Sequence, residues 1–208
     1  MTEQPDAVFD VGTAPQETEV GEPRAEEAVA PAEEAVAPAE HVEGGLRVPE
    51  GYSVVEGEAR GDGRSVGVVV SRFNGEITGA MLEQALGELA RAGVPQEAIT
   101  VVPVPGAFEL PLAAMALAKS RRYACVVALG CVIRGETPHF DYVAGEAASG
   151  IQLAGIETGV PVAFGVLTCD TVEQAEARVS RAVTAARSAL EMADLFRQLR
   201  AAVQPTGG

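Results

Sequence analysis

The side chain best suited to chemistry in this 208-residue chain is a histidine that lies six residues after an apolar run. His139 ends the segment Gly-Cys-Val-Ile-Arg-Gly-Glu-Thr-Pro-His, and the ordinary pKa of histidine suits proton transfer near neutral pH. The run Ala124 to Ile133 ahead of it is rich in valine, which is typical of a strand buried on both faces of a parallel sheet. His139 is therefore a candidate acid or base, although a single histidine can also be structural.

The residues that follow this strand have the composition of an anion-binding turn. Thr137 is expected to cap a helix whose first position is Pro138. Backbone amides at a helix N-terminus attract anions, so the amides of Gly135 and Glu136 form a candidate phosphate site together with Arg134. Arg134 can equally form a surface ion pair.

Three further turns at expected strand ends carry candidate binding residues. In the first, the ring of Phe73 can stack on a flat heterocycle or pack in the core. In the second, Gly106 and Ala107 let a ligand approach backbone amides, while Glu109 either accepts hydrogen bonds from hydroxyl groups or stabilises a helix start. In the last, Phe164 is a core residue or a second aromatic wall.

Strand-like and helix-like segments alternate from residue 65 onward, which requires right-handed crossovers and a parallel sheet. The expected strands are Ser65 to Ser71, Ile99 to Val104, Ala124 to Ile133 and Pro161 to Thr168. The expected helices are Ile77 to Ala92, Phe108 to Lys119, Phe140 to about Thr158, and the strongly helical region Thr171 to Arg200. We predict a three-layer, flavodoxin-like α/β fold with a four-stranded parallel sheet flanked by helices and a ligand at the carboxyl ends of its strands. Weak alternation over Tyr52 to Ala59 predicts a short N-terminal edge strand, which an oligomer could cover.

Acidic charge is concentrated at the N-terminus. Residues 1–50 contain thirteen acidic and two basic side chains, net −11, whereas residues 51–208 contain 17 acidic and 13 basic ones, net −4. The unit Ala-Glu-Glu-Ala-Val-Ala-Pro occurs at 25–31 and again at 32–38, and its proline interrupts any helix. We therefore predict a disordered acidic arm over 1–50 and one α/β domain over 51–208.

Several classes of function lack their sequence features. There is no basic surface for nucleic acid, no Walker loop, no G-x-G-x-x-G after the first strand and no serine elbow. Cys125, Cys131 and Cys169 have no C-x-x-C spacing, so reduced core cysteines and no metal site are expected. No signal peptide or membrane-spanning run is visible, so we expect a cytoplasmic protein with neither nucleic-acid nor membrane partners.

Together, the four turns resemble those of the lumazine synthase family. The matching stretches are Val70 to Asn74 with Ile77 and Thr78, Val104 to Pro111, Ala128 to Glu146, and Pro161 to Thr168. The resemblance runs from about Tyr52 to Arg200 and leaves the acidic arm unmatched. It is specific, because several separate motifs recur in order at comparable spacing.

The resemblance implies condensation of 5-amino-6-ribitylaminouracil with 3,4-dihydroxy-2-butanone 4-phosphate to 6,7-dimethyl-8-ribityllumazine and phosphate, without a metal or organic cofactor. His139 would transfer protons, and Gly135, Glu136 and Thr137 would hold the phosphate. The positions that match the family's pyrimidine and ribityl contacts are Phe73, Asn74, Gly106, Ala107, Phe108, Glu109, Val132, Ile133 and Phe164.

One segment departs from the family pattern. The family typically has an arginine and then a loop with glycine and lysine before its last helix, and that loop contributes to phosphate binding. Here Arg178 is followed by Arg181 with no glycine or lysine before the last helix. We expect Thr171 to Arg200 to form one long helix, or two with a slight break near Ser180. Arg178 and Arg181, on one face, would replace the lysine or simply face solvent.

The resemblance also implies a homo-oligomer, either a pentamer or an icosahedral shell of pentamers, with active sites shared between subunits. The segment Tyr52 to Ala59 would then join a neighbouring sheet, and riboflavin synthase becomes a candidate partner. The shortened loop keeps two alternatives open. These are a non-catalytic, shell-forming scaffold and a lumazine- or flavin-binding protein of the same fold.

Overall fold

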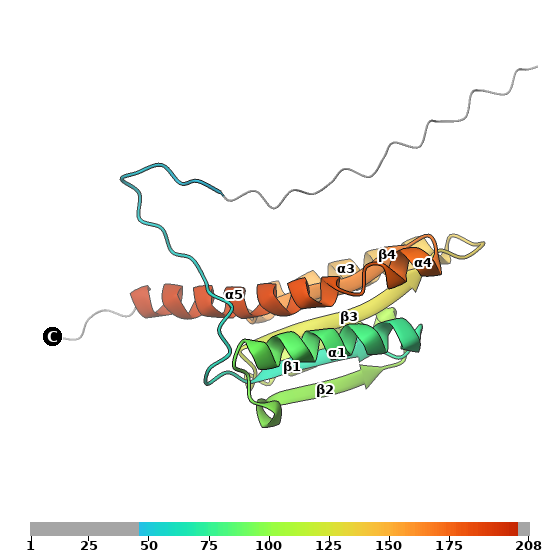
Figure 1. Cartoon of the computed structure of the whole chain (residues 1–208), viewed down its shortest axis with the longest axis horizontal. Helices are drawn as coiled ribbons and strands as arrows, with labels where there is room; N and C mark the ends of the chain where they lie inside the picture. The colour runs from blue at the N-terminus through green and yellow to red at the C-terminus, as the bar shows by residue number, and fades with distance from the viewer. Residues whose placement is uncertain (1–45, 204–208) are drawn as a thin grey trace, which may run out of the picture. The chain divides into compact units, whose positions relative to one another are not determined.

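The computed structural model describes residues 46–203, and residues 48–203 belong to one compact unit. The predicted acidic arm falls almost wholly on residues 1–45, outside this described part. A four-stranded parallel sheet lies at the centre of the unit, in the order β2-β1-β3-β4 (Figure 1). Its strands are β1 (Val66–Ser71), β2 (Ile99–Val104), β3 (Cys125–Ile133) and β4 (Val162–Cys169). The predicted four-stranded parallel sheet is confirmed.

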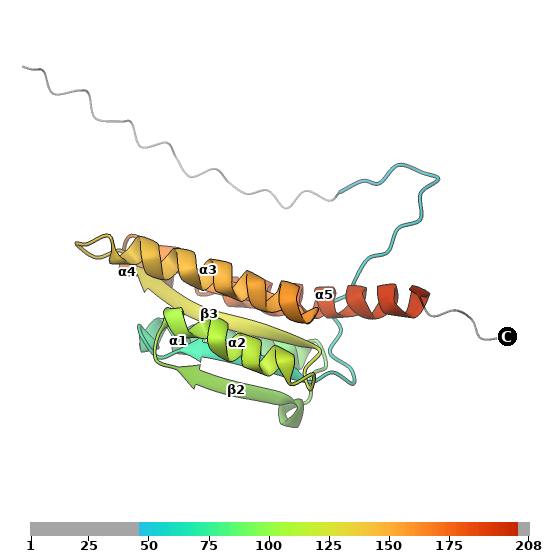
Figure 2. The same cartoon turned by 180° about the vertical axis from the view of Figure 1, so that it is seen from behind.

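Helices cover both faces of this sheet. α1 (Gly75–Arg91) and α5 (Arg181–Val203) lie in front of it in Figure 1, and α2 (Leu110–Lys119) and α3 (His139–Thr158) lie in front of it in Figure 2. Side chains alternate across a strand, so Val68 packs in the α1/α5 core and Val69 in the α2/α3 core. The predicted three-layer α/β fold is therefore confirmed.

The strands and helices end where the local chemistry requires. β3 has neighbours on both sides and helices on both faces, and eight of its nine residues are buried. α1 starts after Asn74, which is left-handed at φ 56°, and stops at Gly93, with φ 93°. Pro111 lies in the first turn of α2, where its missing N–H is not needed.

The C-terminal region forms two helices with a break, the second of the two forms predicted for it. A short α4 (Val172–Glu176) precedes α5, and residues 177–180 form turns between them. Thr171 caps α4 by accepting a hydrogen bond from the amide of Gln174. Arg178 therefore lies in the connection and Arg181 at the start of α5, so they do not share the face of one helix.

Two local predictions were wrong. The edge strand expected at Tyr52 to Ala59 does not form within the described chain, because the oxygen of Glu56 and the amide of Glu58 bond to side chains of α5 instead. Thr137 does not cap α3, because the helix begins at His139, with Pro138 at the N-cap position and no side-chain cap.

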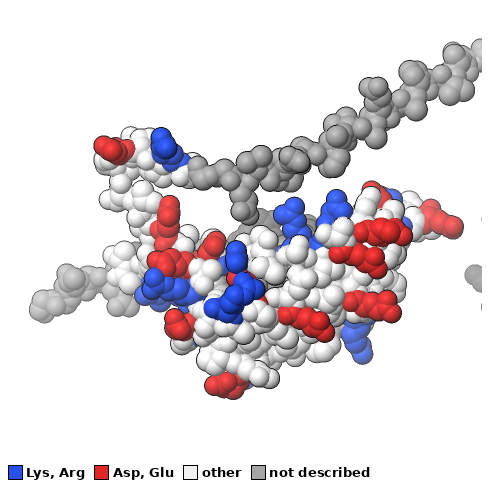
Figure 3. Space-filling model, in the orientation of Figure 1, with Lys and Arg blue, Asp and Glu red and all other residues white. Residues whose placement is uncertain are grey.

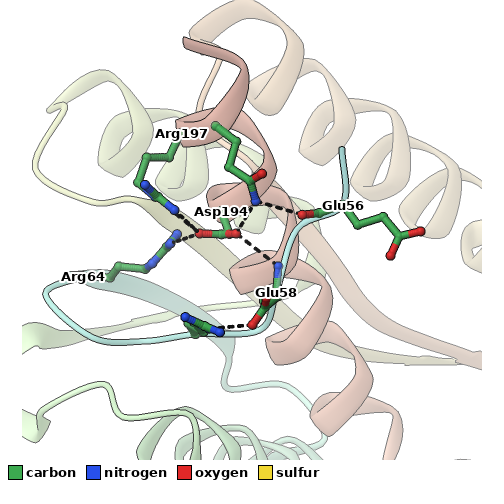
Figure 4. Close-up of polar contacts among 7 residues, drawn as sticks. Glu56, Glu58, Arg64, Asp194 and Arg197 are labelled. Atoms are coloured by element: carbon green, nitrogen blue, oxygen red, sulfur yellow. Dashed lines mark hydrogen bonds and ion pairs between the residues drawn. The ribbon is translucent and has the colours of Figure 1, made fainter. Parts of the chain in front are cut away.

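Residues 56–64, which we call the N-terminal strap, are fixed across α5 by a buried carboxylate. Asp194 accepts hydrogen bonds from the amide of Glu58 at 3.2 Å, from Arg64 at 2.6 Å and from Gln198 at 2.7 Å (Figure 4). Arg197 donates to the same carboxylate at 3.0 Å. Every oxygen of this buried charge is thus paired, as burial of a carboxylate requires.

Gly57 allows this close approach, and its substitution tests it. A methyl group at Gly57 would lie 2.0 Å from the main-chain oxygen of Glu191. We expect Gly57→Ala to lower the free energy of unfolding by about 1–3 kcal/mol, because the strap must move off the helix. Gly87→Ala is the matched control: it lies within α1 with open space around it and should stabilise by about 0.5–1 kcal/mol. Chemical denaturation of both variants measures the difference, and equal stabilities would contradict the packing argument.

The surface of the described residues mixes both signs of charge. On the face seen in Figure 3, acidic and basic side chains are interspersed and no extended basic area is visible. No helix within residues 46–203 has the length and apolar character needed to cross a membrane.

Candidate functional site

A cavity of about 340 Å³ opens at the carboxyl ends of β1, β2 and β3. Parallel sheets place ligands at this edge, because the strand-end turns converge there. The cavity is lined by Phe73, Gly106, Ala107, Phe108, Cys131, Val132, Ile133, Gly135, Thr137, His139, Phe140 and Val143. Nine of these residues were predicted from the sequence, so three of the four strand-end turns do meet.

The end of β3 forms the rear wall of this cavity. Cys131, Val132 and Ile133 belong to an internal strand and are buried or half-buried. Asn74 does not line the cavity. Its side-chain amide instead donates to the main-chain oxygen of Cys131 at 3.0 Å, which ties the start of α1 to the wall.

Two of the phenylalanine rings that line the cavity are exposed. Phe73 is 70% exposed and Phe108 is 55% exposed, so neither is a core residue. Exposed aromatic rings beside a cavity are available to stack on a flat ligand. The exposure of Phe73 contradicts its interpretation as a core residue.

The turn after β2 presents its backbone to the cavity. Gly106 and Ala107 both line it, as predicted. Glu109 does not. Its carboxylate accepts a hydrogen bond from the amide of Gly106 at 2.9 Å and so stabilises the turn that leads into α2. This contact matches the helix-start interpretation of Glu109.

The turn before α3 carries the histidine. His139 is the first residue of the helix and lines the cavity together with Gly135 and Thr137. In the described part of the chain, the side chains of Glu136, Thr137 and His139 have no hydrogen-bond partner. The first turn of α3 thus leaves amide groups and an imidazole available to a ligand.

Arg134 lies beside this turn and pairs with carboxylates. Its Nε donates to Asp170 at 2.9 Å and its Nη1 to Asp141 at 3.2 Å. Its guanidinium also lies over the ring of Phe140, 4.1 Å from the centroid. The hydrogen bond to Asp170 is the main reason why the pKa of Arg134 is raised. The ion-pair interpretation of Arg134 is the one the structure supports.

Phe164 lies in a second cleft, apart from the cavity. This cleft, of about 430 Å³, lies between β4 and α5 and is lined by Phe164 together with Arg181, Thr184 and Ser188. Phe164 is 46% exposed and is therefore not a core residue. The side chain of Arg181 has no hydrogen bond or ion pair within residues 46–203, so its charge is available in this cleft.

Arg178 lies outside both cavities. Its Nη1 donates to the main-chain oxygen of Gln174, at the start of the break between α4 and α5, at 2.8 Å. The two arginines predicted to act together therefore have different surroundings. Arg178 is hydrogen-bonded to the main chain of α4, whereas Arg181 lines the same cleft as Phe164.

The three cysteines are free and buried, as predicted. Burial raises the pKa of Cys125 to about 12 and that of Cys131 to about 11. Cys131 lines the cavity but stays protonated near neutral pH, so it contributes shape rather than a nucleophile.

Sequence reasoning missed three lining residues. Val143 lies four residues after His139, so helical spacing alone could have placed both on one face. Phe140 belongs to the same first turn. Cys131 carried no signal, because an apolar residue at the end of a buried strand has the same pattern whether it faces a core or a cavity.

The comparisons with known proteins agree with this geometry. The family model for 6,7-dimethyl-8-ribityllumazine synthase matches residues 63–197, which include every lining residue of both cavities. The chain is also 49% identical, over 152 residues, to a 6,7-dimethyl-8-ribityllumazine synthase of Syntrophus aciditrophicus (strain SB). This match spans 71% of the present chain and 99% of the relative. The chain therefore belongs to the 6,7-dimethyl-8-ribityllumazine synthase family.

Proposed function

We propose that the protein catalyses a step of riboflavin biosynthesis, the condensation of 5-amino-6-ribitylaminouracil with 3,4-dihydroxy-2-butanone 4-phosphate to 6,7-dimethyl-8-ribityllumazine. The observation that carries the proposal is the composition of the cavity. At one edge of the sheet it is lined by His139, by the turn before α3, whose side chains have no hydrogen-bond partner among the described residues, and by exposed aromatic rings. The 5-amino group attacks the ketone to give an imine with loss of water, and phosphate then leaves by elimination. The ribitylamino nitrogen attacks the remaining carbonyl and closes the ring with loss of a second water. These steps need positioning and proton transfer, which protein side chains supply.

The residues of the cavity have distinct roles in this proposal. Phe73 stacks on the pyrimidine, and the backbone of the Gly106 turn receives the ribityl hydroxyl groups. Gly135 and Thr137, with the neighbouring amide of Glu136, hold the phosphate at the N-terminus of α3. His139 then transfers protons between the substrate nitrogen and oxygen atoms. Asn74 and Glu109 support the turns rather than contact the substrate, because their side chains bond to the protein.

The direct test is an activity assay with the purified full-length protein and both substrates. Appearance of lumazine fluorescence above the uncatalysed rate supports the proposal. A shell-forming scaffold or a lumazine-binding protein gives none above that rate, so a negative result with correctly folded protein would favour those alternatives.

We further propose that two subunits complete each site, in a pentamer or a shell built of pentamers. Phe164 and Arg181 are exposed in a separate cleft, so they can face the substrate only if a neighbouring copy brings that cleft to the cavity. Tyr52, Val54 and Val55 precede the N-terminal strap, form no strand in the single chain and expose apolar side chains. In an assembly, these residues would pair with the open edge at β2 of a neighbour.

We also propose that residues 1–50 are an arm separate from the domain over 51–208. Light scattering on the full-length and arm-deleted proteins measures the assembly size and the effect of this arm on it.

Arg178 and Arg181 are proposed to supply the positive charge near the phosphate. Replacing both with alanine should raise the KM for the phosphorylated ketone by about tenfold or more, because a charge-assisted hydrogen bond contributes roughly 1.5–3 kcal/mol. The KM for the pyrimidine should change little. Steady-state kinetics with each substrate varied in turn measures both values, and an unchanged ketone KM would exclude this role. The single variants then show which arginine matters.

The setting of the reaction is also a proposal. A biosynthetic enzyme with these small-molecule substrates is expected in the cytoplasm, with riboflavin synthase as a candidate partner because it consumes the lumazine product. Co-purification of the two proteins tests the partnership.

A further inference from the structure

The guanidinium of Arg134 joins the two ends of the turn that carries the candidate phosphate site. Arg134 is the last residue before this turn, and its own amide donates to the main-chain oxygen of Cys169 at 2.9 Å, next to the end of β4. Its side chain reaches over the turn to the first residues of α3, where it lies over Phe140 and bonds to Asp141. Its Nε bonds to Asp170, which directly follows β4.

Few other contacts restrain this turn. Residues 134–139 are exposed, and α3 starts without a side-chain cap. Within residues 46–203, the side chains of Glu136 and Thr137 have no hydrogen bond. A bond from the amide of Asp141 to the oxygen of Pro138, at 3.0 Å, holds only the helix start itself. The side chain of Arg134 therefore connects the start of α3 with the residue that follows β4.

We infer that Arg134 is a positioning residue, which sets the place of His139 and of the phosphate-binding amides by clamping Phe140 and Asp141 of α3 to Asp170 after β4. This inference rests on the proposed function. Phe140 directly follows His139 in the first turn of α3, so a shift of that turn moves the imidazole with it. Arginine suits the role because its planar group can stack on a ring and donate to two carboxylates at the same time.

The same contacts contribute little to overall stability. Arg134, Asp141 and Asp170 are all exposed, and exposed ion pairs contribute little to the stability of a fold. A small displacement of a reacting group, in contrast, strongly lowers the rate of a reaction that depends on positioning. Loss of the clamp should therefore lower activity at nearly unchanged melting temperature.

The experiment separates clamping from simple attraction of phosphate by a positive charge. Arg134→Met should lower kcat by about tenfold, and Arg134→Lys should not restore it, because lysine keeps the charge but lacks the planar fork. The double variant Asp141→Asn, Asp170→Asn leaves the arginine in place without its carboxylate partners and should also lower kcat. Arg60→Met, which removes an exposed arginine that pairs with Glu58, far from this turn in the sequence, is the matched control and should have wild-type kinetics.

Each alternative outcome overturns the inference. If Arg134 acts only through its charge, Arg134→Lys restores activity, and the double asparagine variant binds the phosphorylated ketone more tightly at unchanged kcat. If Arg134→Met unfolds the protein, the double variant still decides, because an unchanged kcat there excludes the clamp. An inactive wild-type protein would contradict the proposed function itself, whereas an active wild type with unaffected variants contradicts only the role of Arg134.

Discussion

Replacing His139 with asparagine should lower kcat by about 10²–10⁴-fold, the usual contribution of a positioned general acid or base. Asparagine keeps a polar side chain of similar reach but cannot exchange a proton near neutral pH. The side chain of His139 has no hydrogen-bond partner within the described residues, so its loss leaves no buried group unpaired and the fold should be unaffected. Single-turnover kinetics, monitored by lumazine fluorescence, measure the chemical step directly.

The only other histidine of the chain provides the control. His41 lies outside the described residues and outside the stretch that the family model matches. His41→Asn should therefore retain wild-type kcat and KM. If His139→Asn stays within about threefold of wild type, the proton-transfer role in the proposed mechanism is wrong and the site acts by positioning alone.

The second large effect is expected on stability, at Asp194. Asp194→Asn removes the negative charge that pairs with Arg64, whose side chain is only 11% exposed, and with Arg197. Breaking a buried ion pair from one side leaves the remaining charge without compensation and is strongly destabilising. We expect the melting temperature to fall by several degrees, measured by calorimetry. Glu191→Gln, an exposed carboxylate on the same helix, is the control and should change it little.

The pH dependence of stability provides an independent check on Asp194. Hydrogen bonds from Gln198 and Arg197 hold the pKa of Asp194 well below its usual range. A carboxylate with a lowered pKa in the folded state stabilises the protein above its unfolded-state pKa, near 4, and loses this contribution as the pH falls below that value. The wild type should therefore lose stability more steeply than Asp194→Asn between about pH 4 and pH 2. Parallel acid-denaturation curves would contradict the assignment.

Much of the fold could be predicted because its signals are local. The valine-rich runs at β1 and β3 and the apolar spacing in α1 follow directly from burial on a sheet. The cavity could be predicted because parallel strands place their carboxyl ends at one edge, so the turns with Phe73, Gly106 and His139 had to be neighbours.

The features that escaped prediction depend on contacts between distant residues. The path of the N-terminal strap depends on Asp194, more than 130 residues away in the chain, and weak alternation over Tyr52 to Ala59 contains no information about that contact. Asn74 carries a polar side chain that could bind a ligand, but its side-chain amide donates to the main-chain oxygen of Cys131 in β3. Arg134 pairs with two carboxylates, whereas the side chain of Arg181 pairs with none among residues 46–203. Spacing along the chain does not reveal this difference.

The position of β3 determines where the protein loses conformational entropy when a ligand binds. The rear wall of the cavity belongs to an internal strand with hydrogen-bonded neighbours on both sides, so it is already ordered before binding. The turn from Gly135 to Pro138 is exposed and makes few hydrogen bonds, so these four residues should lose most of the conformational freedom that is lost on ligand binding. Affinity for the phosphate group of a ligand should therefore depend on how well this turn is preorganised. Affinity for the heterocyclic ring should depend on the shape of the rigid wall formed by β3.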